Sequence, residues 1–266
     1  MIDIMNVLLT NDDGIQADGM KVMRQSLEKA GHTVYVLAPS GNRSGISSKI
    51  SFFNDLEMYR YSEREWSSSG TPADCVITAF TSGIISEKID VVVAGINAGA
   101  NIGTDIVYSG TCGAARQAAL YGYPGIAVSL DKETVSDYED FEYKPLASFV
   151  AENLHGLCSL AVTDHPRGFV NINAFNLSCY KGAVICNKAS VRSYNDRICV
   201  RKNECSCGSS VTEKDAYIST FSGGNIQTDC SEGTDFGACS NGYIAISVIQ
   251  AEPAVIKVEK DIKFTL

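Results

Sequence analysis

Short apolar runs alternate with amphipathic segments through the first half of the chain. An apolar run that ends at a turn residue predicts a buried strand, and apolar positions that recur every three to four residues predict a helix. This pattern predicts strands over residues 7–10, 33–38, 90–94 and 126–130. It predicts helices over residues 20–30, from Thr71 onward, over 108–122 and over 143–157. Strands separated by helices predict an α/β fold on a doubly wound, mainly parallel sheet.

The pattern changes after Phe175. Residues 182–228 contain short β-type runs with polar turns between them, which predicts β-hairpins that project from the core. A short helix near Gly233 and a returning core strand over 242–249 follow, and a weakly amphipathic tail begins at Glu252. The sequence therefore predicts three regions, a catalytic core (1–181), a hairpin region that builds the subunit interface (182–228), and a returning strand with a tail (229–266).

Oxygen-bearing side chains follow three of the predicted strands. Asp12 and Asp13 follow the first strand, Ser44 follows the second, and Asn97 follows the strand over 90–94. Because the carboxyl ends of parallel strands meet at one edge of a sheet, we expect these side chains to converge. Carboxylate, hydroxyl and amide oxygens are ligands that Mg²⁺ and Mn²⁺ accept. Their low number leaves positions for water and substrate, which favours a catalytic ion over a structural one.

Each of these residues also has a structural interpretation. Asn11-Asp-Asp-Gly14 is compatible with a simple turn that caps the next helix, Ser44 with a hydroxyl that caps its own loop, and Asn97 with a left-handed turn. Arg43 is either a solvated side chain or a phosphate partner. Ser109, Gly110 and Thr111 open a predicted helix, where free amides attract phosphate but where ordinary N-capping is equally expected.

Composition excludes several classes of function. The net charge is −9, the isoelectric point is near 4.9, and no Lys/Arg cluster occurs, which argues against a nucleic-acid polymer or an anionic membrane as the main partner. The apolar fraction of 45% supports a sizeable core, and no apolar stretch is long enough for a membrane span. The acidic start of the chain does not fit a signal peptide, so we expect a cytoplasmic protein.

Ten cysteines in a reducing compartment are expected to be free thiols. Cys75, Cys112 and Cys239 lie in apolar patterns and are expected in the core. Cys205 and Cys207 are the one close pair, and they lack the further ligands of a zinc site. None of the three histidines lies in a loop with candidate site residues, which disfavours a Ser-His-Asp mechanism.

Six motifs occur in a characteristic order. They are Asn11-Asp-Asp-Gly14, Ala38-Pro39 with Asn42-Arg-Ser-Gly45, Gly70-Thr-Pro-Ala-Asp-Cys75, Gly95-Ile-Asn-Ala-Gly99 with Asn101, Tyr108-Ser-Gly-Thr111, and Gly233-Thr-Asp-Phe236 with Gly242-Tyr243. In this order the chain resembles the SurE (survival protein E) nucleotidase family. Ser40, Ala100 and residues 46–48 depart from the family's usual residues, which leaves the metal ligands intact and the substrate preference open.

The resemblance implies a Rossmann-like core and a metal-dependent phosphomonoesterase that acts on nucleoside 5′- and 3′-monophosphates. It implies one divalent cation held by Asp12, Asp13, Ser44 and Asn97. Both acids are candidate catalytic residues: Asp13 is expected to assist proton transfer and Asp12 to act mainly as a ligand, and the sequence leaves the reverse assignment open. The expected phosphate contacts are Asn11, Arg43, Gly45, Asn101, Ser109, Gly110 and Thr111. In the family the hairpin region and an exchanged C-terminal tail join subunits, which implies a homodimer or homotetramer.

Two other functions fit the paired acids less well. A non-catalytic, Mg²⁺-binding switch domain of the receiver type needs a phosphorylatable Asp after a later strand, where this chain has Gly95-Ile-Asn97. A haloacid-dehalogenase phosphatase needs two acids separated by one residue, whereas Asp12 and Asp13 are adjacent.

Overall fold

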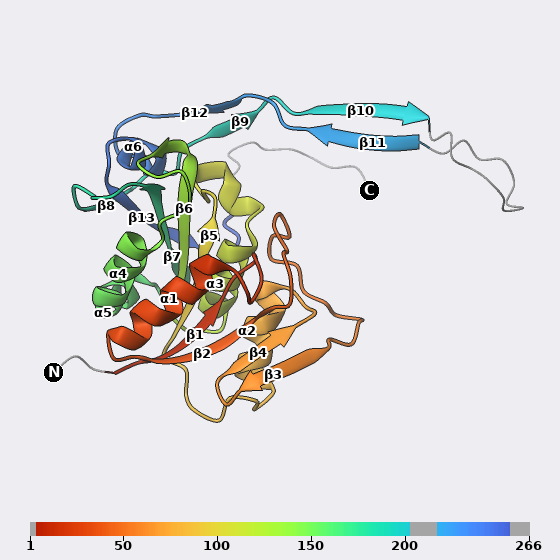
Figure 1. The fold of residues 1–266 in the computed structure, drawn as a ribbon, viewed down its shortest axis with the longest axis vertical. Coiled ribbons are helices and arrows are strands. Elements are labelled where there is room, and N and C mark those ends of the chain that lie inside the picture. Colours follow the sequence, from red (N-terminus) through yellow and green to blue (C-terminus); the bar gives the residue numbers. More distant parts are fainter. Residues whose placement is uncertain (1–3, 203–216, 256–266) are drawn as a thin grey trace, which may run out of the picture.

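The computed structural model describes residues 4–202 and 217–255. Among these residues, nine strands form one sheet in the order β3-β4-β2-β1-β5-β6-β7-β13-β8 (Figure 1). The strands are β1 (Asn6–Thr10), β2 (Thr33–Pro39), β3 (Met58–Ser62), β4 (Glu65–Ser68), β5 (Val91–Ala98), β6 (Gly125–Ser136), β7 (Gly168–Asn176), β8 (Ala183–Ile185) and β13 (Ile244–Gln250). Strands β4, β2, β1, β5, β6 and β7 run parallel, and β13 is antiparallel to β7. The doubly wound, mainly parallel sheet is confirmed.

Helices cover both faces of the sheet. Because alternate side chains of a strand point to opposite faces, Leu9 packs in a core cluster with α1 and α4, while Leu8 packs in another with α2 and α3. Both leucines are fully buried, as expected for strands covered on two sides. The helices are α1 (Asp18–Lys29), α2 (Pro72–Thr81), η1 (Gly103–Val107), α3 (Gly110–Leu120), α4 (Lys144–Glu152), α5 (Leu154–Leu160) and α6 (Asp235–Ser240).

The predicted core elements are present, with differences at their ends. Helix α2 begins where it was predicted, with Thr71 as its N-cap, and Thr71 forms a capping box with Asp74. The helix predicted over 143–157 is divided into α4 and α5 at Asn153. Strand β5 continues to Ala98, so Asn97 lies on a strand with an irregular register and not in a loop. Strands β3, β4 and β7 were not predicted. Cys75, Cys112 and Cys239 are buried in the core, as expected.

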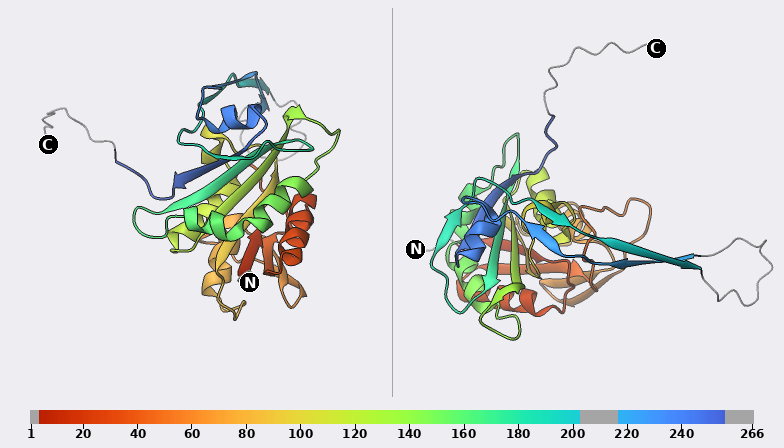
Figure 2. Two further views of the ribbon diagram at one scale, coloured as in Figure 1. Left: turned by 90° about the vertical axis from the view of Figure 1, so that its left-hand side faces the viewer. Right: turned by 90° about the horizontal axis from the view of Figure 1, so that it is seen from above.

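The hairpin region is a two-part ribbon. Strand β9 (Arg192–Tyr194) pairs with β12 (Ile226–Thr228), and β10 (Arg197–Lys202) pairs with β11 (Tyr217–Ser222). Figure 1 and the right-hand view of Figure 2 show β10 and β11 extending away from the body of the molecule. The prediction was wrong for residues 183–187, because β8 pairs with β13 and extends the main sheet. The open edge of β13 provides the backbone partners that a projecting strand would lack.

The chain order places the candidate site at a reversal of the sheet. Strand β1 lies between β2 and β5, so the crossover from β1 runs to one side and later strands are added on the other. Ligands bind at such reversals, outside the carboxyl ends of the strands. Asp12 and Asp13 directly follow β1 at this point. No helix in the described part of the chain is long and apolar enough to cross a bilayer. The tail from residue 256 onward, expected to be exchanged between subunits, lies outside the described residues.

Candidate active site

Asp12 is held between the end of β1 and the start of α3. Its side chain is 3% exposed, and its Oδ1 accepts a hydrogen bond from the Thr111 hydroxyl at 2.5 Å. Ser109 is the N-cap of α3, and its hydroxyl accepts from the Cys112 amide. A Cβ atom on Gly110 would lie 2.8 Å from Asp12 Oδ2, so only glycine permits this close approach. The amino end of α3 therefore stabilises negative charge at Asp12.

Asp13 faces the end of β5. Its half-buried carboxylate accepts a hydrogen bond from the Ala98 amide at 3.1 Å. Burial raises the pKa of the Asp12 carboxyl, and burial together with the charge of Asp12 raises the pKa of Asp13. Among the described residues, no basic side chain forms an ion pair with either acid. Two adjacent carboxylates that lose water without a countercharge provide the environment that a divalent cation stabilises.

Asn97 and Ser44 bring uncharged oxygens to the same edge. Asn97 uses its Nδ2 to donate to the Gly99 carbonyl at 2.8 Å, so its Oδ1 is the atom suited to ligation. Ser44 is exposed in the loop after β2, where its amide donates to Asn42 Oδ1 at 2.8 Å. The amide of Arg43 donates to the Asp12 carbonyl at 2.6 Å, which ties this loop to the end of β1.

One cavity of about 300 Å³ collects most of the predicted residues. Its lining includes six of them, namely Asp12, Ser44, Gly45, Asn97, Asn101 and Ser109. Asp13 adjoins this cavity through its bond to Ala98, which is also part of the lining, and Gly110 and Thr111 adjoin it through their contacts with Asp12. The loops after β1, β2 and β5 therefore converge, as the strand order requires.

Two predicted phosphate contacts are engaged elsewhere. Asn11 is fully buried and exchanges hydrogen bonds with Gly14, so its side chain holds the turn that presents the two acids. The guanidinium of Arg43 donates to the carbonyls of Asn42, Ser69 and Gly70, and so holds the segment that leads into α2. Neither residue lines the cavity.

Buried polar residues on β6 and β7 position Asn101, and the sequence interpretation missed them. Asn101 donates to Ser129 Oγ at 2.7 Å and, through its amide, to Asn173 Oδ1 at 2.8 Å. Asn171 and Asn173 in turn donate to the Asn101 carbonyl. Two asparagines at alternate positions of the apolar run over 168–176 were the available signal. Buried amides of this kind are retained where hydrogen bonds fix a loop.

The hairpin region also contributes to the cavity, which was not predicted. Asp105 and Tyr108 from η1 and the residue after it line the cavity, together with Tyr194 from β9. The hydroxyl of Tyr194 and the guanidinium of Arg192 both donate to the Asp105 carboxylate. Burial, and then the neighbouring Asp105, raise the pKa of Tyr194, so its hydroxyl stays protonated as a donor.

Comparison with known proteins agrees with this arrangement. The family model described as Survival protein SurE matches residues 7–195. The chain belongs to the SurE family. It is 35% identical over 250 residues to the 5′-nucleotidase SurE of Haemophilus influenzae (strain PittGG), covering 93% of this chain and 92% of that one. It is 43% identical over 189 residues to the 5′-nucleotidase SurE of Treponema pallidum (strain Nichols), covering 70% of this chain and 98% of that one.

A solved structure of the family has the same fold. The crystal structure of the SurE protein from Aquifex aeolicus superimposes with a TM-score of 0.75 at 27% identity, covering 94% of each chain. Together with the relatives, this structure confirms the resemblance inferred from the six motifs.

The oxygen-rich donor set of this SurE chain suits a hard cation. Within residues 4–202 and 217–255, no three His, Cys, Asp or Glu side chains gather in a way that could hold a metal ion. The proposed ligands include two carboxylates, those of Asp12 and Asp13, joined by the oxygens of Ser44 and Asn97, which suits an ion that keeps several water ligands. Cys205 and Cys207 lie outside the described residues.

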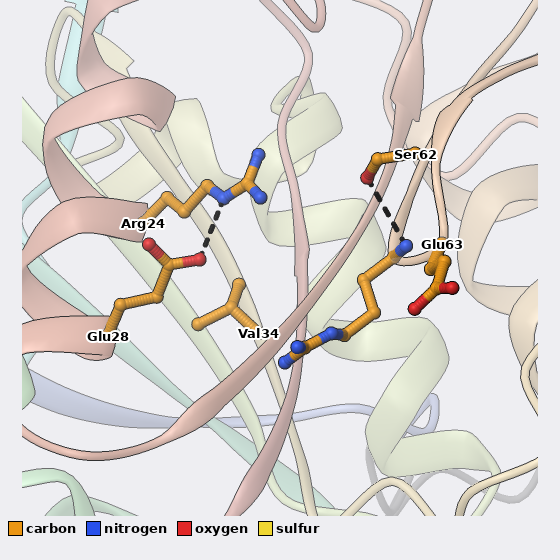
Figure 3. Close-up of a pocket in the computed structure, with 6 residues that line it drawn as sticks. Arg24, Glu28, Val34, Ser62 and Glu63 are labelled. Carbon is orange, nitrogen blue, oxygen red and sulfur yellow. Dashed lines mark hydrogen bonds and ion pairs between the residues drawn. The ribbon is translucent and has the colours of Figure 1, made fainter.

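Three larger cavities in the described part of this SurE chain lack such chemistry. Figure 3 shows the first, of about 430 Å³, where Arg24 pairs with Glu28 near Ser62 and Glu63 at the opposite end of the strands. The second, of about 1040 Å³, lies between α1 and α4 and includes His32, whose Nδ1 accepts from the Met5 amide at 3.3 Å. The third, of about 750 Å³, lies in the hairpin region and is lined by Asp196, Arg197 and Gly223 among others. None of the three has two adjacent acids at the carboxyl ends of the parallel strands, so we assign the chemistry to the smaller cavity.

Proposed function

We propose that this SurE protein is a metal-dependent nucleotidase that hydrolyses nucleoside 5′-monophosphates, and 3′-monophosphates as well, to nucleoside and phosphate. The observation that carries the proposal is the pair of desolvated acids, Asp12 and Asp13, at the sheet edge where Asn97 and Ser44 converge. The names of the relatives, 5′-nucleotidase SurE, support the substrate class.

Four residues would hold one Mg²⁺ or Mn²⁺ ion, namely Asp12, Asp13, Ser44 and Asn97. When bound, this ion neutralises phosphate charge and lowers the pKa of a bound water. Hydrogen bonds from the Thr111 hydroxyl and from the backbone amides of Gly110 and Thr111 favour the ionised form of Asp12 against the effect of burial. Asp12 is then suited to ligation, while Asp13, which is less buried, is placed to accept a proton from the attacking water.

Water, and not Ser44, is the nucleophile in this proposal. Among the residues that line the described cavity there is no His or Lys that could act as a base for the Ser44 hydroxyl. Water adds to phosphorus as Asp13 accepts one of its protons, the bond between phosphorus and the nucleoside oxygen breaks, that oxygen takes a proton from solvent, and phosphate is released. In H₂¹⁸O a single turnover should therefore place one ¹⁸O in the phosphate, and a phosphoserine trapped at Ser44 would contradict direct attack.

The hairpin region is proposed to join subunits into a homodimer or homotetramer. Ile198, Val200 and Phe221 on the β10–β11 ribbon are each at least 60% exposed. An isolated two-stranded ribbon is marginally stable in water, so an exposed apolar face on one favours burial against a second copy. We also propose that the protein is cytoplasmic, a reducing compartment in which its cysteines stay free thiols.

A substrate panel tests the proposed reaction. Phosphate release should be measured from adenosine 5′-monophosphate, adenosine 3′-monophosphate and a phosphodiester of similar size, each with Mg²⁺ and with Mn²⁺. The monoesters should be hydrolysed and the diester should not, because the proposal assigns a monoesterase. Hydrolysis of the diester alone would contradict the assignment.

A further inference from the structure

The cavity at the sheet edge has two chemically different walls. The loops after β1 and β2 and the end of β5 supply oxygen ligands, whereas Tyr108 follows η1 and Tyr194 lies on β9. These tyrosines are the aromatic residues in the lining of the described cavity, and neither has a part in the hydrolysis proposed above. A nucleotide whose phosphate lies at the oxygen-rich wall still requires a surface for its base.

Tyr108 presents a ring from a fixed backbone. Its amide donates to the Asp105 carbonyl at 2.9 Å, and its carbonyl accepts from the Ser47 amide at 2.9 Å. The side chain is 61% exposed, although the next residue, Ser109, is the buried N-cap of the helix that contacts Asp12. The ring therefore remains accessible to solvent directly beside the end of the cavity assigned to phosphate.

Tyr194 is held by a partly buried ion pair. Its hydroxyl and the guanidinium of Arg192 donate to different oxygens of the Asp105 carboxylate, so both oxygens of Asp105 are occupied. The side chains of Arg192 and Asp105 are 10% and 13% exposed. The Arg192 guanidinium carbon lies over the Tyr194 ring, 6.0 Å from its centroid, while Tyr194 is still 38% exposed. The ring is thus oriented in advance and remains partly open.

We propose that Tyr108 and Tyr194 form an aromatic wall on which the base of the nucleotide stacks, with Asp105 and Arg192 as positioning residues for Tyr194. This inference rests on the proposed nucleotidase function and extends it to recognition of the nucleoside. Stacking on aromatic rings is a strong, general means of binding a base, and a ring fixed before binding loses little entropy. The projecting hairpin then contributes at its base to substrate binding in its own subunit.

Steady-state kinetics on two substrates test the wall. Adenosine 5′-monophosphate has a base, and ribose 5-phosphate has the same phosphate and sugar without one. Tyr108→Ala and Tyr194→Ala should each raise KM for the nucleotide about 10-fold, the scale of one lost stacking contact, with kcat nearly unchanged. KM for ribose 5-phosphate should stay at the parent value. Equal changes with both substrates, or no change with either, would overturn the proposal.

Two further variants separate stacking from a structural role. Tyr194→Phe keeps the ring and removes the bond to Asp105, so its KM for the nucleotide should be much closer to the parent value than that of Tyr194→Ala. If Tyr194 only anchored the hairpin, Tyr194→Phe would be as damaging as Tyr194→Ala, which would refute the wall. Tyr59→Ala is the matched control, because Tyr59 is 57% exposed on β3 and does not line the cavity.

A binding measurement distinguishes failure of this inference from failure of the proposed function. Saturation-transfer NMR of adenosine with the parent enzyme needs no hydrolysis. The base protons should receive the strongest saturation, and the effect should be lost in the double variant Tyr108→Ala/Tyr194→Ala. If the parent hydrolyses neither phosphate ester but the base protons of adenosine show the expected saturation, the proposed hydrolysis is wrong and base stacking on the aromatic wall is supported. An unchanged saturation signal in the double variant would refute the aromatic wall, whatever the hydrolytic activity.

Discussion

The sheet core and the hairpin ribbon are built by opposite means. Every residue of β7 is buried, whereas every residue of β10 is exposed. In the core, packing on both faces fixes the strand ends, so the oxygen ligands need few contacts of their own. The ribbon has no core, and polar contacts at its base, above all those of Asp105 with Arg192 and Tyr194, fix its direction. Catalytic residues are therefore expected in the sheet core. Contacts with the nucleotide base and with a second subunit are expected in the hairpin ribbon.

The largest loss of activity should come from substitution of Asp12, the acid in the core that has the most contacts. Asp12→Asn removes a charged ligand but keeps the size of the side chain, so activity should fall at least about 100-fold, the scale of losing a main electrostatic contributor. Phosphate release at saturating Mn²⁺ measures this. Asp18→Asn is the matched control, because the Asp18 side chain is 82% exposed at the start of α1. Near-normal turnover of Asp12→Asn would show that the metal site does not lie at this edge of the sheet.

Truncation of an aliphatic side chain should distinguish the two regions by stability. Leu9 is fully buried in β1, so Leu9→Ala should lower the free energy of unfolding by about 3 kcal/mol through lost burial and a cavity. Val200 is 60% exposed on β10, and Val200→Ala should change it by less than about 0.5 kcal/mol at low protein concentration. Urea titration gives both values. If the two variants lost similar free energies of unfolding, the ribbon would have to pack against another part of the same chain.

Removal of the ribbon should change assembly without removing catalysis. Replacing residues 197–222 with a short glycine-containing turn keeps β9, β12 and β8, all of which contact the body or one another. Light scattering should then report fewer subunits, while hydrolysis of adenosine 5′-monophosphate persists. If the truncated protein keeps the parent's subunit number, the interface lies elsewhere and the tail from Glu252 becomes the better candidate.

The smallest expected effect is a gain in stability. Because burial raises the pKa of Asp13 in the folded state, the folded protein binds its proton more tightly than the unfolded chain does. The stability contributed by protonated Asp13 is complete below the unfolded-state pKa and is lost as pH rises through the raised, folded-state pKa. In EDTA at neutral pH, Asp13→Asn should therefore have a higher free energy of unfolding than the parent, by less than about 1 kcal/mol because solvent screens the half-buried carboxyl.

The pH dependence provides the control for Asp13→Asn. Thermal melts in EDTA should show the gain shrinking as pH falls through the folded-state pKa, because the parent carboxyl then becomes protonated. A gain that is the same at every pH would point to a cause other than the charge of Asp13.

The sequence was most informative where local rules and packing agree. The acids after β1 and the capping box at Thr71 and Asp74 follow from strand ends and helix starts, which short segments encode. The roles of Asn171 and Asn173 could not be predicted, because they depend on β7 lying two strands away from β5. Tyr194 was missed for a related reason, since its place in the cavity depends on Asp105, a contact across 89 residues. The roles of these residues depend on contacts between segments far apart in the sequence, and composition does not reveal such contacts.

The most direct test of a metal-dependent nucleotidase at this sheet edge is phosphate release from adenosine 5′-monophosphate before and after EDTA treatment, with Mn²⁺ then returned. The account predicts that EDTA abolishes release by the parent, that Mn²⁺ restores it, and that Mn²⁺ restores nothing to Asp12→Asn. Full activity of the parent in EDTA, or full recovery of Asp12→Asn with Mn²⁺, would contradict it.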